Sequence, residues 1–244
     1  MKKIYLVGIG PGDSAQMTAQ AMAAMEASEV LCGYTVYIDL VRGLFPDKEF
    51  YTTPMTQELQ RCQWAVESAC SGRTTAMLCS GDAGIYGMAA PLLQLAEGKD
   101  LDIEIVPGIT AALSGAAVLG APLTNDFCVI SLSDLMTPPE LIRRRLEGAG
   151  AGDFVVCLYN PMSRKRKDHL KKACDILLQY RSGGTVCGWV RNIGREGQAS
   201  ALLTLEELRE AELDMFTTVF IGCSATRIVD GRMVTPRGYE EKYG

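Results

Sequence analysis

The chain has 244 residues, of which 48% are hydrophobic and 22% charged, with a formal net charge of −5. This balance is ordinary for a globular protein that is long enough to bury a sizeable core in one or two domains. The acidic charge disfavours a general nucleic-acid binder, and no stretch approaches the ~20 apolar residues of a membrane span, so we expect neither nucleic acid nor membrane as a partner.

Strands and helices alternate through the first half of the chain. The β-prone run from Lys2 to Val7 predicts a strand; because no signal-peptide pattern stands there, we expect a cytoplasmic protein. Further strands are expected at 30–32, 74–79 and 102–106, and helices at 15–27, 56–71, 87–96 and 110–119. Such alternation predicts a mainly parallel sheet covered by helices.

The pattern changes around residue 120. Strands are expected at 128–131, 154–158, 186–190, 200–204 and 217–222, helices at 139–147, 165–180 and 205–211, and a β-hairpin at 226–235 around Asp230-Gly231. The fold class is therefore α/β. We expect an N-terminal α/β domain over residues 1–119 and a mixed α/β domain over residues 120–244, with a cofactor cleft between them.

Two glycine-rich turns follow strands of the first half. They read GIGPGD at 8–13 and SGDAGIYGM at 80–88. A turn with few side chains lets a ligand approach the backbone and leaves N–H groups free to bind it. Two such turns in one sheet predict a ligand across the carboxyl edge of that sheet.

These turns do not fit the common nucleotide-binding fingerprints. The dinucleotide pattern G-x-G-x-x-G would need glycine at Asp13 and would not place Pro11 after the second glycine. No Gly-Lys-Ser/Thr follows either turn, which excludes a P-loop. If the turns were only tight connections between strand and helix, without a ligand, this would explain one glycine-rich turn well but the two together poorly.

The nine cysteines are odd in number and show no C-x-x-C spacing. Most lie in apolar runs, where a free thiol behaves as a small hydrophobe. We therefore interpret them as core residues and expect no protein-bound metal, although an iron–sulfur cluster held by distant cysteines stays open.

Together the motifs resemble the tetrapyrrole (corrin-type) S-adenosylmethionine-dependent methyltransferases. The resemblance covers essentially the whole chain and includes, besides both turns, VPGITAA at 106–112, LYNP at 158–161, VRNIGREGQ at 190–198 and FTTVFIG at 216–222. GYTVYIDL at 33–40, GAPLTNDFCVISLSDLMTP at 120–138 and MVTPRGY at 233–239 are similar to the branch that methylates carbon 17 of precorrin-3B or cobalt-precorrin-3 in cobalamin biosynthesis.

The resemblance implies a class III methyltransferase fold, a homodimer, S-adenosylmethionine as co-substrate, and methylation accompanied by ring contraction of a tetrapyrrole. The alternatives are a sibling methylase acting at another carbon or on uroporphyrinogen, and a non-catalytic S-adenosyl-nucleoside-binding module. Carried over by position, the implied cofactor-binding residues are Pro11, Ser80, Gly81, Asp82, Ile85, Thr110, Ala111, Tyr159, Asn192 and Thr217. For Thr110, a helix cap is an equal alternative.

The chemistry suggests further residues. Methyl transfer needs mainly positioning, but ring contraction moves protons, and Asp134, Ser131 and Tyr34 in the branch-specific segments are the catalytic candidates. The substrate carries many carboxylates, for which arginine forks are suited, so Arg164, Arg166 and Arg191 are candidate substrate-binding residues. The only histidine, His169, lies in a charged run that is most simply interpreted as a solvated helix face.

Overall fold

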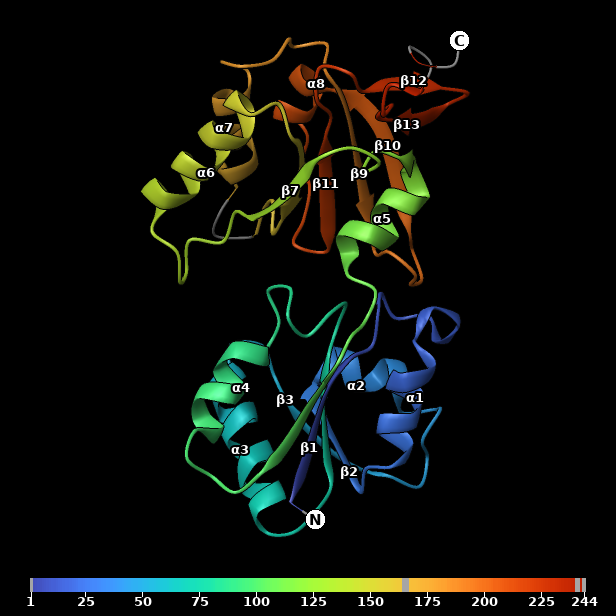
Figure 1. Cartoon of the computed structure of the whole chain (residues 1–244), viewed down its shortest axis with the longest axis vertical. Helices are drawn as coiled ribbons and strands as arrows, with labels where there is room; N and C mark the ends of the chain where they lie inside the picture. The colour runs from blue at the N-terminus through green and yellow to red at the C-terminus, as the bar shows by residue number, and fades with distance from the viewer. Residues whose placement is uncertain (1, 164–166, 240–241, 243–244) are drawn as a thin grey trace. The chain divides into compact units, whose positions relative to one another are not determined.

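A computed structural model describes residues 2–163, 167–239 and 242 and separates the chain into two compact units, Met1–Ala111 and Ala112–Gly244 (Figure 1). The expected pair of α/β domains is confirmed. The division falls after Ala111, the first residue of helix α5 (Ala111–Leu119), whereas the sequence suggested a boundary after the helix, at residue 119. The reason is packing: a Cβ on Gly115 of α5 would lie 2.9 Å from the ring of Phe220 in the second unit.

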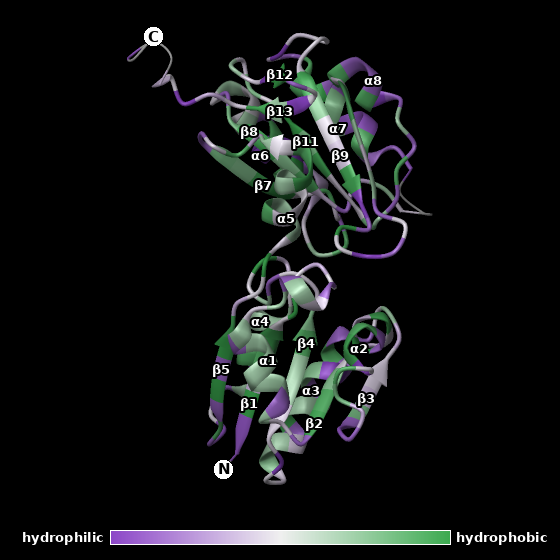
Figure 2. Cartoon of the chain, turned by 90° about the vertical axis from the view of Figure 1, so that its right-hand side faces the viewer, coloured by the Kyte–Doolittle hydropathy of each residue, from purple (hydrophilic) through white to green (hydrophobic). Residues whose placement is uncertain are grey.

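The first unit is built on a five-stranded, fully parallel sheet in the order β3-β2-β4-β1-β5. The strands are β1 (Lys3–Gly8), β2 (Val30–Tyr34), β3 (Glu49–Thr53), β4 (Thr75–Cys79) and β5 (Asp102–Val106). β2 is mainly hydrophobic along its length (Figure 2), as expected of a strand whose two faces are both covered.

Helices cover both faces of this sheet (Figure 1). One core joins Val7 and Leu31 to α1 (Ala19–Glu26) and α2 (Thr35–Val41), and the other joins Ile4 and Leu6 to α3 (Glu58–Cys70) and α4 (Ala89–Ala96). The single helix expected over 15–27 is instead a 3₁₀ turn, Ser14–Gln16, followed by α1. The helix begins at Ala19 because the Thr18 hydroxyl caps it by accepting the Ala21 N–H.

The second unit contains a five-stranded mixed sheet in the order β10-β9-β11-β8-β7. Only the β7–β8 pair is parallel; β11 runs antiparallel to β8 and β9, and β10 antiparallel to β9. The strands are β7 (Phe127–Ser131), β8 (Val155–Tyr159), β9 (Val186–Arg191), β10 (Ala199–Thr204) and β11 (Thr217–Ile221).

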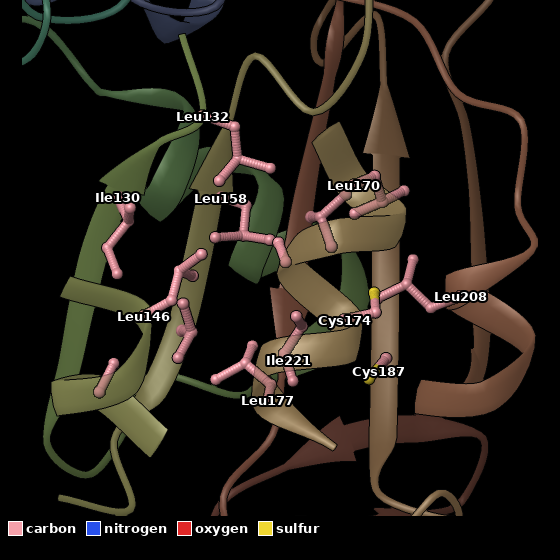
Figure 3. Packing of buried hydrophobic residues seen from close by; sticks show 14 of the residues in the cluster. Ile130, Leu132, Leu146, Leu158, Leu170, Cys174, Leu177, Cys187, Leu208 and Ile221 are labelled. Atoms are coloured by element: carbon pink, nitrogen blue, oxygen red, sulfur yellow. The ribbon is translucent and has the colours of Figure 1, made fainter. Parts of the chain in front are cut away.

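One face of this sheet carries the main core of the unit (Figure 3). There, helices α6 (Pro139–Ala151), α7 (His169–Leu177) and α8 (Leu205–Arg209) pack Leu146, Leu170, Cys174 and Leu208 onto the strands. The expected hairpin forms as β12 (Arg227–Val229) and β13 (Arg232–Val234), and β13 also pairs with the short β6 (Gly120–Ala121). Within the described residues, every helix is too short or too polar to cross a membrane.

Candidate functional site

The first unit gathers its loops at the carboxyl edge of its parallel sheet. β1 ends at Gly8, β2 at the catalytic candidate Tyr34, β4 at Cys79 and β5 at Val106. GIGPGD therefore leaves the sheet from β1, SGDAGIYGM from β4 and VPGITAA from β5. In the sheet, β1 lies between β4 and β5, so the three turns are neighbours at its carboxyl edge. This is the edge at which open α/β sheets bind their ligands.

The first two turns are joined by paired backbone hydrogen bonds. The Gly10 N–H donates to the Gly81 carbonyl (3.1 Å), and the Gly81 N–H donates to the Gly10 carbonyl (2.7 Å). Both residues have a left-handed backbone, with φ of 66° and 67°, which glycine adopts without steric cost. The two turns therefore form one rigid platform.

The third turn is fixed to this platform by close backbone approach and by Asp82. A Cβ on Gly108 would lie 2.1 Å from the Gly81 carbonyl oxygen and 2.5 Å from that of Gly8. The Asp82 carboxylate accepts the Gly108 N–H at Oδ2 (3.0 Å) and the Gly84 N–H at Oδ1 (2.8 Å). Asp82 therefore holds two of the three loops in place.

The remaining cofactor candidates of this unit lie on the same three loops. Pro11 and Gly81 are buried, Ser80 is half-buried, and Ile85 is 43% exposed beside the exposed Tyr86. Thr110 and Ala111 stand at the start of α5, and the Thr110 Cα would lie 3.5 Å from a Cβ on Gly81. The loops thus combine a side-chain-poor backbone surface with the exposed side chains of Ile85, Tyr86 and Ile109.

The second unit also brings its candidates to one edge of its sheet. In the strand register, Ser131 of β7 pairs with Tyr159 of β8, and Arg191 of β9 pairs with Thr217 of β11. Because β11 runs antiparallel to β8 and β9, its first residue lies at the edge where those strands end. Residues expected from four separate motifs are therefore neighbours along this edge.

Several of these side chains hold local backbone. The Tyr159 hydroxyl accepts the Ala112 N–H (2.8 Å), one of the N–H groups in the first turn of α5 that lack a partner within the helix. The Ser131 hydroxyl accepts from the Asn160 side-chain amide (3.0 Å) and from the Ser133 N–H (3.2 Å). Asn160 was not named among the candidate residues, although the LYNP motif places it directly before Pro161; its left-handed φ of 54° is an observation of the structure.

Asn192 follows Arg191, the residue of β9 that pairs with Thr217. Thr217 is 2% exposed, and its hydroxyl donates to the Asp214 carboxylate (3.0 Å). The Asn192 N–H donates to the Phe216 carbonyl (3.2 Å), and Asn192 has a left-handed φ of 50°. Both residues shape the turns at this edge.

The structure changes the interpretation of His169. The helix expected over 165–180 begins at His169, so the histidine stands at the start of α7. Its side chain is 18% exposed, and its Nε2 lies 3.5 Å from Oδ2 of Asp134, whose side chain is 31% exposed. The imidazole therefore faces a catalytic candidate on another element, which the solvated-face interpretation did not expect.

Of the three arginines proposed to bind substrate, the structure describes only Arg191. Arg191 is exposed at the end of β9, on the edge just described. Arg164 and Arg166 lie outside the described residues.

Most of the cysteines are core residues: seven of the nine are buried, Cys128 is half-buried and Cys70 is exposed. Burial raises the pKa of Cys62 to about 12 and that of Cys79 to about 11. Such thiols are protonated at neutral pH and behave as small core hydrophobes. Over residues 2–163, 167–239 and 242, no three His, Cys, Asp or Glu side chains are grouped to hold a metal ion.

Known proteins similar to this chain match it over nearly its whole length. A curated relative from Salmonella typhimurium, "Probable cobalt-factor III C(17)-methyltransferase", is 45% identical over 97% of this chain and 99% of its own length. A Sinorhizobium relative, "Precorrin-3B C(17)-methyltransferase", is 39% identical over 97% of this chain and 96% of its own. The crystal structure of the methyltransferase CobJ superposes with a TM-score of 0.88 at 34% identity, covering 96% of this chain and 99% of that one.

A family model described as Tetrapyrrole (Corrin/Porphyrin) Methylases matches residues 3–209, which span both units. The chain belongs to the tetrapyrrole methylase family.

Proposed function

We propose that this chain is an S-adenosylmethionine-dependent methyltransferase that methylates carbon 17 of cobalt-factor III or precorrin-3B, with ring contraction, in cobalamin biosynthesis. The observation that carries the proposal is the 45% identity over nearly the full length of a relative whose name gives that reaction. The Sinorhizobium relative, whose name gives precorrin-3B, is also similar over nearly the whole chain and names the same carbon.

The loops of the first unit fit an S-adenosyl nucleoside. This ligand carries an adenine edge, a ribose diol and a zwitterionic amino acid, which backbone groups and small polar residues can bind. The close approach of Gly8, Gly81 and Gly108 leaves a surface that any larger residue would disturb. The exposed Ile85 offers an apolar contact for a flat ring. We assign Pro11, Ser80, Gly81, Asp82, Ile85, Thr110 and Ala111 to cofactor binding in this unit, with Asp82 acting through the loops that it holds.

In the second unit, we propose Tyr159, Asn192 and Thr217 as further cofactor residues, because they lie along one edge of the sheet. The same edge supports a macrocycle site over residues 124–137. Leu135 and Met136, which directly follow Asp134, are 71% and 93% exposed. Large apolar side chains beside polar ones suit a flat, largely apolar ligand with a polar rim.

When bound, the sulfonium cofactor supplies an already activated methyl group. The protein's own residues therefore act by orienting the two reactants and excluding water. Arg191 is proposed to bind a substrate carboxylate, because its guanidinium is a bidentate donor at the edge where the other candidates lie.

We further propose a cytoplasmic homodimer. The absence of disulfides among the nine cysteines, all within the described residues, is typical of a reducing compartment. Phe127 of the edge strand β7 and Ile228 of the hairpin are 40% and 54% exposed, which favours a protein partner for the second unit. Analytical ultracentrifugation tests the dimer, which a sedimenting species of 26.4 kDa would exclude.

The function is tested by anaerobic incubation with methyl-labelled S-adenosylmethionine and either cobalt-factor III or precorrin-3B, followed by mass spectrometry. Gain of one labelled methyl at carbon 17 by either macrocycle supports the proposal and identifies the accepted substrate. Label at another carbon would assign the chain to a sibling methylase. Binding of S-adenosylhomocysteine without methylation of either macrocycle would overturn the proposal.

A further inference from the structure

His169 and Asp134 form a carboxylate–imidazole pair to which the proposed function assigns no chemical role. The Nε2 atom of His169 lies 3.5 Å from Oδ2 of Asp134. Histidine is the side chain that most readily exchanges a proton near neutral pH, and a carboxylate beside it orients the ring and stabilises its charged form. The chain contains no other histidine.

Both members of the pair are held by the core of the second unit. His169 is the first residue of α7, whose next turns bury Leu170, Ala173 and Cys174. On the other side, the Leu132 N–H donates to the Tyr159 carbonyl (2.9 Å) and the Ser133 N–H to the Ser131 hydroxyl (3.2 Å), which fixes the segment that leads to Asp134. In functional sites, side chains are typically held in place by rigid elements of the core and by additional hydrogen bonds.

The other charged side chains near His169, on α7 and on the elements packed against it, form ion pairs with other residues. Asp168 precedes it, and its carboxylate lies 2.5 Å from the Lys172 ammonium, whose hydrogen bond lowers the pKa of Asp168. The charges of α8 that face α7 pair further along the helix: Arg209 with Asp175, and Glu210 with Lys171. On α6, Arg143 pairs with its own helix through Glu140 and Glu147. Among the described residues, Asp134 is the carboxylate at ion-pair distance from the imidazole.

The proposed reaction needs a group of this kind. When a sulfonium donates methyl, its carbon–sulfur bond breaks and the electron pair remains on sulfur. The macrocycle carbon forms the new carbon–carbon bond with its own electron pair and so acquires one positive charge. The product regains its former charge only by losing one proton, which a base must accept.

We propose that His169 is this base and that Asp134 is its positioning residue, an inference that rests on the proposed function. With Nε2 directed toward Asp134, the neutral imidazole accepts the proton at Nδ1 and becomes imidazolium beside the carboxylate. It then releases the proton to water, to which its side chain is 18% exposed. Asp134 stands three residues after Ser131 and directly before the exposed Leu135 and Met136, in the segment assigned to the macrocycle, and His169 reaches that segment through its contact with Asp134.

The test compares wild type with His169→Gln, Asp134→Asn, Asp134→Glu and the double variant His169→Gln/Asp134→Asn. Asp168→Asn is the matched control, because that carboxylate is adjacent in sequence but faces Lys172. Each protein is assayed anaerobically for methylated macrocycle from pH 5 to 9. S-adenosylhomocysteine affinity and thermal unfolding are measured on the same samples.

We expect His169→Gln to lower kcat by about 10²- to 10⁴-fold with little change in S-adenosylhomocysteine affinity, as for loss of a general base. The dependence of kcat on pH should also change shape in this variant relative to wild type. Asp134→Asn should lower kcat at least about ten-fold, with partial recovery in Asp134→Glu and no further loss in the double variant, because the two residues act as a unit.

If His169→Gln kept the wild-type kcat, the proposed role of His169 and Asp134 would be overturned, while the proposed function would stand. Equal losses in Asp168→Asn would have the same consequence, because they would indicate a structural effect at the start of α7. If wild type methylates neither macrocycle, the proposed function fails and the pair's role fails with it.

Discussion

Replacing Gly108 with alanine should separate the three loops at the carboxyl edge of the first sheet. The new methyl group would lie 2.1 Å from the Gly81 carbonyl oxygen and 2.5 Å from the Gly8 carbonyl oxygen. Both neighbours are backbone atoms of a platform held by paired hydrogen bonds, so neither can turn away as a flexible side chain would. At least one loop must therefore move by more than 1 Å to restore an ordinary contact of roughly 3.5 Å.

The expected cost follows from what that movement disturbs. Overpacking a tight site costs about 1–3 kcal/mol. The Gly108–Asp82 hydrogen bond (3.0 Å) and the Gly10–Gly81 pair are the bonds at risk, and losing one or two of them adds about 1–2 kcal/mol. We expect a loss of about 2–5 kcal/mol, which corresponds to a fall in Tm of roughly 5–15 °C for a chain of this size.

The assay is thermal unfolding together with calorimetric binding of S-adenosylhomocysteine. Gly43→Ala is the matched control, because a Cβ at Gly43 meets nothing within 4 Å and its φ is not left-handed. It should unfold like wild type and bind equally well. The reasoning would be refuted if Gly108→Ala unfolded within about 2 °C of wild type, since even 1 kcal/mol should shift Tm by that much.

Three further predictions concern groups whose surroundings the structure defines. Asp82→Asn can accept only one of its two backbone N–H groups, so we expect about 1–3 kcal/mol less stability and weaker S-adenosylhomocysteine binding, by urea unfolding and calorimetry. Burial raises the pKa of Cys62 to about 12 and that of Cys79 to about 11, so the unfolded thiols ionise first, at a pH of roughly 8.5. Stability should therefore be full below that pH and fall as the pH rises further. Cys62→Ala should lessen the fall of the urea midpoint between pH 8 and pH 10 by one thiol's share only, because burial also raises the pKa of other thiols, such as Cys79 and Cys174. Cys70, which is exposed, should react fastest with Ellman's reagent, and Cys70→Ser should remove that phase.

Much of the fold could be predicted because local patterns and packing agree. The alternation in β1 sends Ile4 and Leu6 to one core and Val7 to the other, which is the pattern of a strand covered on both faces. Helix α2 and strand β3 were not predicted. Thr35 follows β2 with no side-chain cap on the helix, and its β-prone neighbours resemble a continuing strand. Tertiary packing of Ile38 and Val41 overrides that preference.

The positions of the candidate residues could be predicted where they depend on loops and strand ends, and not where they depend on partners far away in the sequence. The pairing of the first two turns follows from their positions after parallel strands. The contact of Asp134 with His169 joins a loop to a helix start across 35 residues, and no periodicity encodes it. The charged run around His169 suggested a solvated face because the helix was expected to begin four residues too early.

Asp82, Tyr159 and Thr217 were expected to bind cofactor, and the structure shows what their side chains bind within the protein. Asp82 accepts backbone N–H groups from two loops, Tyr159 accepts one at the start of α5, and Thr217 donates to Asp214. A side chain used in this way acts on a ligand through the backbone that it positions. Tyr159→Phe would keep the ring and lose only the hydroxyl that accepts the Ala112 N–H, and so distinguishes the two roles. If cofactor affinity falls together with stability, by about 1 kcal/mol for the lost bond, Tyr159 acts through α5; if affinity falls alone, its hydroxyl contacts the cofactor directly.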